Sequence, residues 1–409
     1  MSVCDLGNLH SIEQAISALT HTLNKQTATQ VLPLQQAHKH ILARTVYAQV
    51  DVPQWDNSAM DGYALRASDL QQADHSLPLG GRIAAGDMPE QSLPANQCMQ
   101  ILTGAPLPHG ADTVVPNENC SIGNDRIQFN SYKAGANIRR RGEEIQQGQR
   151  LLEAGSHLRA QEIGLLASQG FAEVEVYTPL RIGLISSGNE LAELGQPLQA
   201  GQIYDINSHS LGALLRGLGF QVTHYKKMPD NLQENIDSLA KASSEQDILI
   251  SSGGVSVGEE DHLKNAVSAL GQLNLWRVAI QPGKPLAFGK VGSTPWIGLP
   301  GNPAAALITA LIIARPALLH AQGASDCNHQ ALLIPALFDW QKPRPRQQYL
   351  HARLVPQDNG QLGVDIHSKQ SSAMLIAASW ADGLVEIKPK ATVAKGDWVT
   401  FIPYANVLG

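Results

Sequence analysis

Residues 250–267, ISSGGVSVGEEDHLKNAV, decide how the central part of this chain folds. An apolar run ends in a Ser-Gly-Gly loop, three carboxylates follow, and an amphipathic pattern then begins, which is typical of a strand–loop–helix joint. Glycine-rich turns at helix starts favour anions, because unpaired backbone N–H groups and the helix dipole point into the loop. Glu259, Glu260 and Asp261 would repel an anion there. A divalent cation held between the acids and the anion would remove that conflict.

The same alternation of strand and helix patterns continues on both sides of this stretch. Apolar, strand-like runs occupy residues 181–186, 220–227, 247–252, 285–290 and 295–300. Helical patterns lie between most of them, at about 207–218, 231–243, 259–270 and 303–321. This rhythm predicts a doubly wound parallel sheet with helices on both faces, in which ligands bind beyond the carboxyl ends of the strands.

The rest of the chain has other patterns. Residues 11–24 and 159–170 carry apolar side chains at helical spacing, and Gly170 is expected to end the second helix. Short β-like pieces separated by Gly and Pro fill about 45–145, which predicts a β-rich domain, and short strand patterns return in 326–409.

The composition narrows the class of protein. At 409 residues, with 43% hydrophobic and 16% charged residues, the chain is long enough for two to four globular domains. Aromatic residues make up 5% and the net charge is -6, which argues against a nucleic-acid-binding protein. The four cysteines show no CxxC spacing and are expected to be reduced thiols of a cytoplasmic protein. No signal peptide pattern is visible, and the apolar run Ala304–Ala314 is too short for a bilayer, so we expect no membrane association.

Three glycine-rich loops follow predicted strands directly and should meet at one edge of the sheet. Glu190 in the first loop and Asp261 in the second are oxygen ligands of the kind that Mg²⁺ prefers. The loops also bring small residues and backbone donors to the expected ligand, namely Gly188, Ser252, Gly253, Gly254, Ser256, Gly301 and Asn302. Each loop taken alone is also explained by tight backbone geometry, and acids at a helix start also favour the helix dipole.

Polar motifs in the β-rich region each have two interpretations. The stretch 56–65, DNSAMDGYAL, offers Asp61 to a ligand, or it forms a turn in which Asp side chains bond the local backbone. Thr103 stands at the end of a strand pattern. Arg139 and Arg140 suit a bidentate grip on phosphate oxygens, or they belong to a solvated loop whose charges pair internally.

The segment around Gly283 offers two more cations, and the chain lacks the motifs of several common enzyme classes. Arg277 and Lys284 flank a turn that contains Gly283, where a cation either reaches a phosphate or is merely exposed. The histidines show no zinc-ligand spacing, and neither a nucleophile elbow nor a Walker A motif occurs. The acids therefore favour metal-assisted attack on a phosphoanhydride over covalent catalysis.

Taken together, these motifs resemble the MoeA family of molybdopterin molybdenumtransferases, which includes the E domain of gephyrin. The matching stretches are DVPQWDNSAMDGYAL, ILTGAPLPHGADTVV, NIRRRGEEI, ISSGNEL, GQIYDINS, ISSGGVSVGEEDHLK, QPGKPLAFGK and GLPGNPAAAL. The resemblance implies an enzyme of molybdenum cofactor biosynthesis. In this activity molybdate is inserted into adenylylated molybdopterin, the adenylyl bond is cleaved, and molybdenum cofactor and AMP are released.

The resemblance also implies a multidomain α/β and β fold in an elongated homodimer. The implied parts are an N-terminal helix (1–26) packed on an α/β domain (180–325), a small connecting domain (27–50 and 146–179), a β-rich domain (51–145) and a C-terminal β-barrel (326–409). The α/β domain is similar to the adenylyltransferase of the same pathway, and that enzyme and other pathway proteins are implied as partners.

The family's functional positions carry over to residues along the whole chain. They fall on Asp61, Thr103, Glu190, Asp230, Asp261, Pro300, Pro303 and Ser372. The family's divalent metal falls to Glu190 and Asp261, where the residues themselves place Mg²⁺.

The chain departs from the family in three places. Arg277 and Gln281 stand where the family usually has lysines, and Glu144 is a longer carboxylate than the usual Asp, whereas Lys284 is kept. Two alternatives stay open on these departures. One is a scaffold or binding module whose site has decayed at Gln281, and the other is a different phosphoanhydride-cleaving enzyme of the same α/β type.

Overall fold

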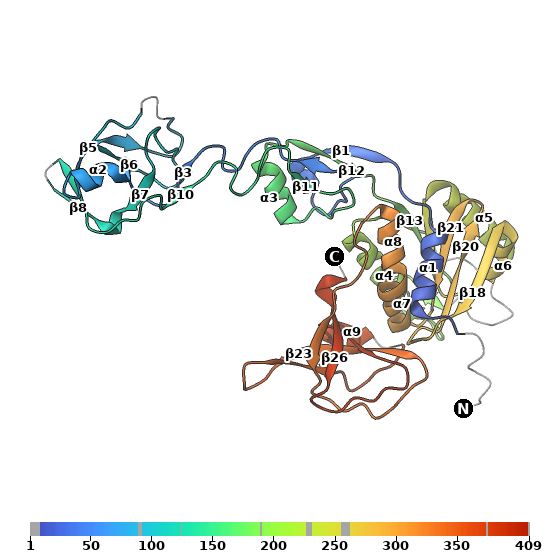
Figure 1. Ribbon diagram of the computed structural model, residues 1–409. Helices are drawn as coiled ribbons and strands as arrows, with labels where there is room; N and C mark the ends of the chain where they lie inside the picture. The colour runs from blue at the N-terminus through green and yellow to red at the C-terminus, as the bar shows by residue number, and fades with distance from the viewer. Residues whose placement is uncertain are drawn as a thin grey trace. The chain divides into compact units, whose positions relative to one another are not determined.

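The computed structural model describes residues 9–88, 92–123, 125–188, 190–225, 231–254, 262–373 and 375–407. The chain divides into two compact units (Figure 1). The first unit comprises Met1–Arg44, Ala154–Ile163 and Glu173–Gly409, and the second comprises Thr45–Glu153 and Gly164–Ala172. The chain therefore begins the first unit, builds the second, and returns to complete the first.

A six-stranded sheet forms the centre of the first unit, in the order β16-β13-β17-β21-β20-β18. The strands are β13 (Arg181–Ser186), β16 (Gln221–His224), β17 (Ile248–Ser252), β18 (Gly271–Arg277), β20 (Pro285–Val291) and β21 (Thr294–Leu299). The four strands from β16 to β21 run parallel, as predicted. β20 and β18 are antiparallel to their neighbours, so the sheet is mixed.

The antiparallel edge corrects the prediction of a fully parallel sheet. Only Gly292 and Ser293 separate β20 from β21. A connection this short closes a hairpin, because a parallel crossover needs a dozen or more residues. β18 then pairs along the other side of β20. Gly289 makes that pairing close, since a Cβ at this position would lie 1.8 Å from the carbonyl oxygen of Gln272.

Helices cover both faces of this sheet, as predicted (Figure 1). One face is packed by α1 (Ile12–Thr22), α4 (Ile206–Gly217), α7 (Pro303–Thr309), the π-helical turn η4 (Ala310–Ala314) and α8 (Arg315–Gln322). The other face is packed by α5 (Leu232–Glu245) and α6 (His262–Leu270). On that second face the fully buried Trp296 of β21 packs with Leu239 and Val267.

The helix Pro303–Gln322 contains the apolar run Ala304–Ala314. By length and composition it is long and apolar enough to cross a membrane, yet 89% of it is buried inside the protein. Leu311 and Leu318 lie in the same core as Leu19 of α1. The prediction that this apolar run forms a buried helix is therefore confirmed.

The C-terminal part of the first unit is a second sheet, in the order β19-β23-β25-β26-β22, with β24 paired to β23. The strands are β19 (Ile280–Gln281), β22 (Leu332–Pro335), β23 (Gln347–Pro356), β24 (Leu362–Ile366), β25 (Gly383–Ile387) and β26 (Trp398–Pro403). A bridge between Ala336 and Val364 curves the sheet back on itself. Two short helices, α9 (Leu375–Trp380) and η5 (Tyr404–Asn406), complete this part.

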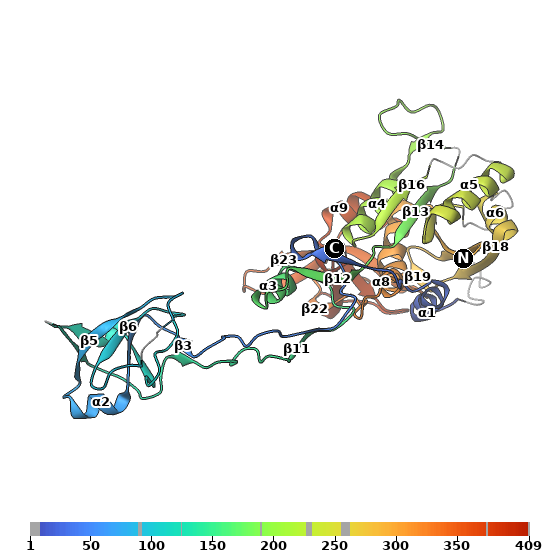
Figure 2. The ribbon, with the colours of Figure 1, turned by 90° about the horizontal axis from the view of Figure 1, so that it is seen from above.

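Smaller elements complete the first unit. β1 (Thr29–Pro33) pairs antiparallel with β12 (Glu173–Tyr177), beside the short helix η2 (Leu34–Gln36). Helix α3 (Ala160–Ser168) lies where the chain passes between the units, and Gly170 follows it with a positive φ of 79°. Between β13 and α4, the pair β14 (Leu191–Ala192) and β15 (Ile203–Tyr204) begins and ends a loop that Figure 2 shows extending outward.

The second unit is β-rich, as predicted, and is built on a sheet in the order β7-β4-β6-β5-β9-β8. These strands are β4 (Gly62–Leu65), β5 (Ser76–Ile83), β6 (Cys98–Ile101), β7 (Thr113–Pro116), β8 (Cys120–Ile122) and β9 (Arg126–Phe129). Its other elements are β2 (Val46–Tyr47), β3 (Asn57–Ser58), β10 (Ile138–Arg139), β11 (Arg150–Leu152), α2 (Ala67–Gln72) and η3 (Asn117–Asn119). Tyr63, Leu77 and Phe129 contribute to its core.

We expect Gly289→Ala to destabilise the first unit by about 2 kcal/mol or more, because the new methyl group forces β18 away from β20. Thermal or urea unfolding of the full chain measures the change. Gly164→Ala controls for the exchange of glycine for alanine itself: a Cβ there meets nothing within 4 Å, and alanine in helix α3 should raise the stability of the chain by up to about 1 kcal/mol rather than lower it. Equal stability of the two variants would contradict the close pairing of β18 with β20.

Candidate active site

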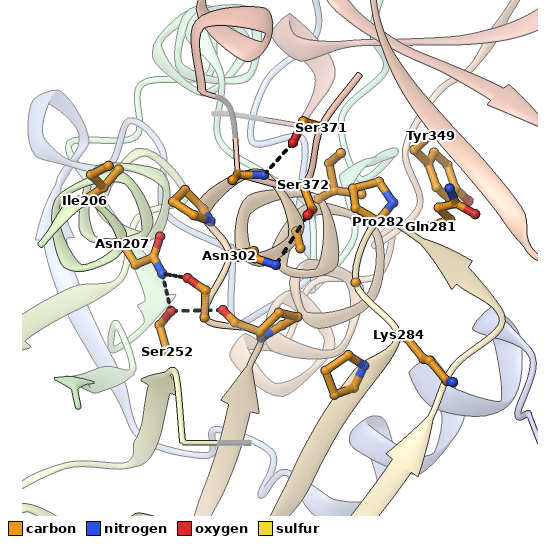
Figure 3. A pocket seen from close by; sticks show the side chains of 18 of the residues that line it. Ile206, Asn207, Ser252, Gln281, Pro282, Lys284, Asn302, Tyr349, Ser371 and Ser372 are labelled. Carbon is orange, nitrogen blue, oxygen red and sulfur yellow. Dashed lines mark hydrogen bonds between the residues drawn. The ribbon is translucent and has the colours of Figure 1, made fainter. Parts of the chain in front are cut away.

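A pocket of about 1150 Å³ lies at the carboxyl edge of the parallel strands (Figure 3). The loops after β13, β17 and β21 all line it, so the three glycine-rich loops do meet. Residues of the turn after β19 and of the segments 340–351 and 368–373 line the remainder. The pocket is thus shared between the α/β sheet and the C-terminal sheet, and it is as large as pockets that hold extended small molecules.

Hydrogen bonds tie the second and third loops together, and close packing joins the first loop to the second. The Ser252 hydroxyl donates to the carbonyl oxygen of Pro300 at 3.1 Å. Asn207, at the start of α4, donates through Nδ2 to both Ser252 Oγ and the Gly301 carbonyl, each at 2.7 Å (Figure 3). A Cβ on Gly253 would lie 3.2 Å from the carbonyl oxygen of Ser187, so the glycine allows close packing of the first two loops. Ser252 and Gly253 therefore have a structural part in the pocket wall.

The N–H groups at the start of helix α7 are hydrogen-bonded within the protein. The N–H groups of Ala304 and Ala305 donate to the carbonyl oxygen of Ser372, at 3.0 and 3.3 Å. Asn302 Nδ2 also donates to Ser372 Oγ at 3.3 Å (Figure 3). Pro303 has no N–H to offer. The first two N–H donors of helix α7 are therefore engaged by the C-terminal part of the chain.

Glu190 lines the pocket directly after the first loop. Gly188 has a φ of 136°, and a Cβ at this position would come within 2.5 Å of Glu190 Oε2, so only glycine leaves the carboxylate where it lies. The residues that the structure describes contain no group of three or more His, Cys, Asp or Glu side chains that would hold a metal ion. One carboxylate beside a polar pocket fits Mg²⁺, which binds through one or two carboxylates and completes its shell with water and phosphate oxygens.

Three residues of the expected site lie outside the described residues. They are Asp230, Ser256 and Asp261. The pairing of Glu190 with Asp261 around a metal therefore stays a prediction from the sequence.

Of the two cations expected around the Pro-Gly turn, only Lys284 lines the pocket. Lys284 and Gln281 line the pocket together with Gly283, where a Cβ would lie 2.4 Å from Thr309 Oγ1. Arg277 is exposed at the end of β18 and is not among the residues that line the pocket. The turn thus presents to the pocket one lysine and, where the family usually has a second, a neutral amide.

In the second unit, the structure brings Asp61 and Thr103 into direct contact. Asp61 Oδ1 accepts hydrogen bonds from the backbone N–H of Thr103 at 2.6 Å and from its hydroxyl at 2.8 Å. The N–H bond and then the hydroxyl bond lower the pKa of Asp61, so its carboxylate is ionised at neutral pH. The carboxylate orients the Thr103 hydroxyl, although 42 residues separate the two in the sequence.

The arginines of the second unit are largely engaged in internal pairs. Arg140 forms an ion pair with Asp56 at 2.6 Å, and Arg141 forms one with Asp51 at 2.6 Å. Burial opposes ionisation of Asp56, but hydrogen bonds from the Arg141 backbone and the Arg140 side chain lower its pKa overall. Arg139 lies in β10, opposite Asn57, and is exposed. The interpretation as a solvated loop with internal pairs describes Arg140 and Arg141.

Sequence reasoning missed the pocket residues of the C-terminal sheet. His351 is 2% exposed, lines the pocket, and lies 2.8 Å through Nδ1 from the Tyr404 hydroxyl. Burial, and then the neighbouring His367, lower the pKa of His351 to about 4, so the imidazole is neutral at physiological pH. Gln370 accepts from the His351 N–H at 3.1 Å and donates to its carbonyl at 2.9 Å, which fixes the loop leading to Ser372. No spacing signal in the sequence marks these residues.

Known protein families match this chain along most of its length. The MoeA N-terminal region (domain I and II) matches residues 10–170, a probable molybdopterin binding domain matches 183–320, and the MoeA C-terminal region (domain IV) matches 334–404. A molybdopterin molybdenumtransferase from Haemophilus influenzae is 37% identical over 98% of this chain and 100% of its own length. The chain belongs to the MoeA family.

Other members of the MoeA family are similar in sequence and fold. A molybdopterin molybdenumtransferase from a Nostoc species is 38% identical over 75% of this chain and 71% of its own length. A crystal structure of the molybdopterin biosynthesis MoeA protein from Pyrococcus horikoshii has a TM-score of 0.76 at 27% identity, and covers 97% of this chain and 99% of its own. A second structure from that organism has a TM-score of 0.81. The resemblance drawn from the motifs, and the MoeA-like multidomain fold, are confirmed.

We expect His351 to make the stability of the first unit depend on pH. Its pKa is 6.5 when unfolded and about 4 when folded, so only the unfolded state takes up the proton between these values. The free energy of unfolding is therefore unaffected by protonation of His351 above pH 6.5. It decreases as the pH falls toward 4, by about 3 kcal/mol in all. Urea unfolding at several pH values measures it. In His351→Gln this part of the pH dependence disappears, whereas the exposed His38→Gln behaves like the unmodified chain.

Proposed function

We propose that this chain is a molybdopterin molybdenumtransferase that inserts molybdate into adenylylated molybdopterin, cleaves the adenylyl bond, and releases molybdenum cofactor and AMP. One observation carries the proposal. The three loops at the carboxyl edge of the α/β sheet converge with Glu190 on a large pocket, in a chain aligned end to end with a relative named for this activity. The alternatives of a decayed scaffold and of a different phosphoanhydride-cleaving enzyme are not favoured, because several relatives of the same name match most of the chain.

In this proposal the residues of the pocket have different roles toward the metal and the substrate. Glu190, with Asp261, would hold Mg²⁺, which supplies charge neutralisation at the phosphate oxygens of the adenylyl bond. Lys284 offers a cation to the anionic substrate from the far side of the Pro-Gly turn. Ser372 and Asn302 fix the wall between the two sheets, and thereby orient the substrate.

The second unit contributes Asp61 and Thr103 in the proposal. The Thr103 hydroxyl donates its proton to the ionised Asp61, which fixes its orientation and leaves its oxygen to accept a hydrogen bond. We further propose that the enzyme is a cytoplasmic homodimer, that it receives its substrate from the adenylyltransferase of the pathway, and that it needs neither nucleic acid nor membrane. Light scattering of the purified chain tests the dimer.

The activity is tested with purified full-length chain, Mg²⁺ and adenylylated molybdopterin. AMP release is expected only when molybdate is present, because metal insertion and cleavage of the adenylyl bond are coupled in the proposed reaction. AMP measured by chromatography, with and without molybdate, is the readout. Absence of release in both samples, or release that ignores molybdate, contradicts the proposal.

Glu190→Gln tests the metal part of the proposal. Loss of one carboxylate ligand should raise the Mg²⁺ concentration that gives half-maximal AMP release by about 10- to 100-fold. Glu193→Gln is the matched control, since Glu193 is exposed in the same excursion of the chain and does not line the pocket. An unchanged Mg²⁺ dependence in Glu190→Gln would falsify the role of this carboxylate.

A further inference from the structure

A basic segment of the C-terminal part lines the pocket opposite the glycine-rich loops. Its sequence is Trp340-Gln-Lys-Pro-Arg-Pro-Arg346, and we call residues 340–346 the basic arm. Lys342, Arg344 and Arg346 all line the pocket, each separated from the next by a proline. Because proline fixes φ, the arm loses little further freedom when its cations bind a ligand. Neither the fold nor the activity proposed above gives this segment a function.

The arm is held at both ends and in the middle. Trp340 exchanges backbone hydrogen bonds with Val393, at 2.8 and 3.0 Å. The Arg344 carbonyl accepts from the N–H of Lys390 at 2.6 Å. At the far end, Arg346 Nη1 donates to the carbonyl oxygen of Ile280 at 3.0 Å. The arm is therefore a preorganised wall of the pocket, which reduces the entropy cost of binding.

Two of the three cations of the arm have no acid paired with them among the described residues. Within the part of the chain that the structure describes, Lys342 and Arg344 form no ion pair. Ion pairs do engage arginines elsewhere, namely Arg44, Arg66, Arg140, Arg141, Arg150, Arg159 and Arg181. Two uncompensated cations on the wall of a pocket create a positive potential that favours an anionic ligand.

The arm reaches the one place in the pocket where the chain lacks an expected cation. Gln281 pairs in register with Gln348 through strands β19 and β23, and both line the pocket. Arg346 bonds the residue that precedes Gln281. Gln348 is 1% exposed, and its Nε2 has no hydrogen-bond partner among the described residues. A nearly buried amide donor without a protein partner is satisfied by a water or by a ligand oxygen that takes its place.

We propose that the basic arm, with Gln348, binds the two phosphoryl groups of the phosphoanhydride in the substrate, and supplies the positive charge that Gln281 does not carry. This rests on the proposed function. Lys342 to Arg346 spans at most about 14 Å of extended chain, which suits two linked phosphoryl groups better than a single compact oxyanion. Guanidinium groups also match phosphate oxygens in bidentate geometry.

The test compares full-length variants of equal net charge. Lys342→Gln/Arg344→Gln should raise the KM for adenylylated molybdopterin, and the Kd for ADP as a phosphoanhydride probe, about tenfold, with kcat changed less than KM. Added salt should weaken ADP binding less in this variant than in the unmodified chain, because fewer charges remain to be screened. Lys388→Gln/Lys395→Gln, at two exposed positions of the same C-terminal part that do not line the pocket, should match the unmodified chain.

A second substitution that restores a positive charge distinguishes an electrostatic role of the arm from a structural one. Gln281→Lys should lower the KM of the arm variant several-fold, yet change the unmodified chain little, because the arm already provides the charge there. An unchanged KM and ADP affinity in the arm variant, no rescue, or an effect confined to the KM for molybdate overturns the inference. If the unmodified chain neither binds ADP nor releases AMP, the proposed function itself fails, whereas an active chain that is indifferent to the arm refutes only the arm.

Discussion

Everything at the pocket depends on how the C-terminal sheet is attached to the α/β sheet. Ser372 places its carbonyl oxygen on two N–H groups at the start of helix α7, and β19 leaves the α/β region to pair with β23. The helix start would otherwise hold donors that only water or an anion satisfies. Because the protein satisfies them internally, the wall of the pocket is fixed in place, and anion binding passes to other groups. The Ser372 carbonyl thus contributes to the shape of the site and removes two donors from it.

The central sheet was predictable because its signals are local. Apolar runs and helical spacing gave five strands of the central sheet and its helices from α4 to α8 within a few residues, and chain order placed the three loops at one edge. The sixth strand, β18, was missed, because its burial pattern is mostly exposed and its sequence has no apolar run. The error at β20 and β21 has an equally local cause, since Gly292 and Ser293 leave room only for a hairpin. Periodicity identifies a strand, but the length of its connection decides its direction.

The contacts that shape the site were not predictable, because they join residues far apart in sequence. Nothing in the pattern pairs Asp61 with Thr103, Gln370 with His351, or Arg140 with Asp56. The motif resemblance named several of these positions but not their partners. Arginine clusters illustrate the difference: in the second unit acids engage Arg140 and Arg141, while in the basic arm Lys342 and Arg344 form no ion pair among the described residues. Residue type alone does not separate the two cases.

The interrupted order of the first unit has a consequence for synthesis on the ribosome. Helix α1 packs in a core that includes Leu311 and Leu318, which are translated almost 300 residues later. At about 5–20 residues per second, the nascent helix waits roughly 15–60 s for its partners. The inserted second unit emerges complete within that interval. The second unit can therefore fold first, whereas α1 can pack on Leu311 and Leu318 only after they have been translated.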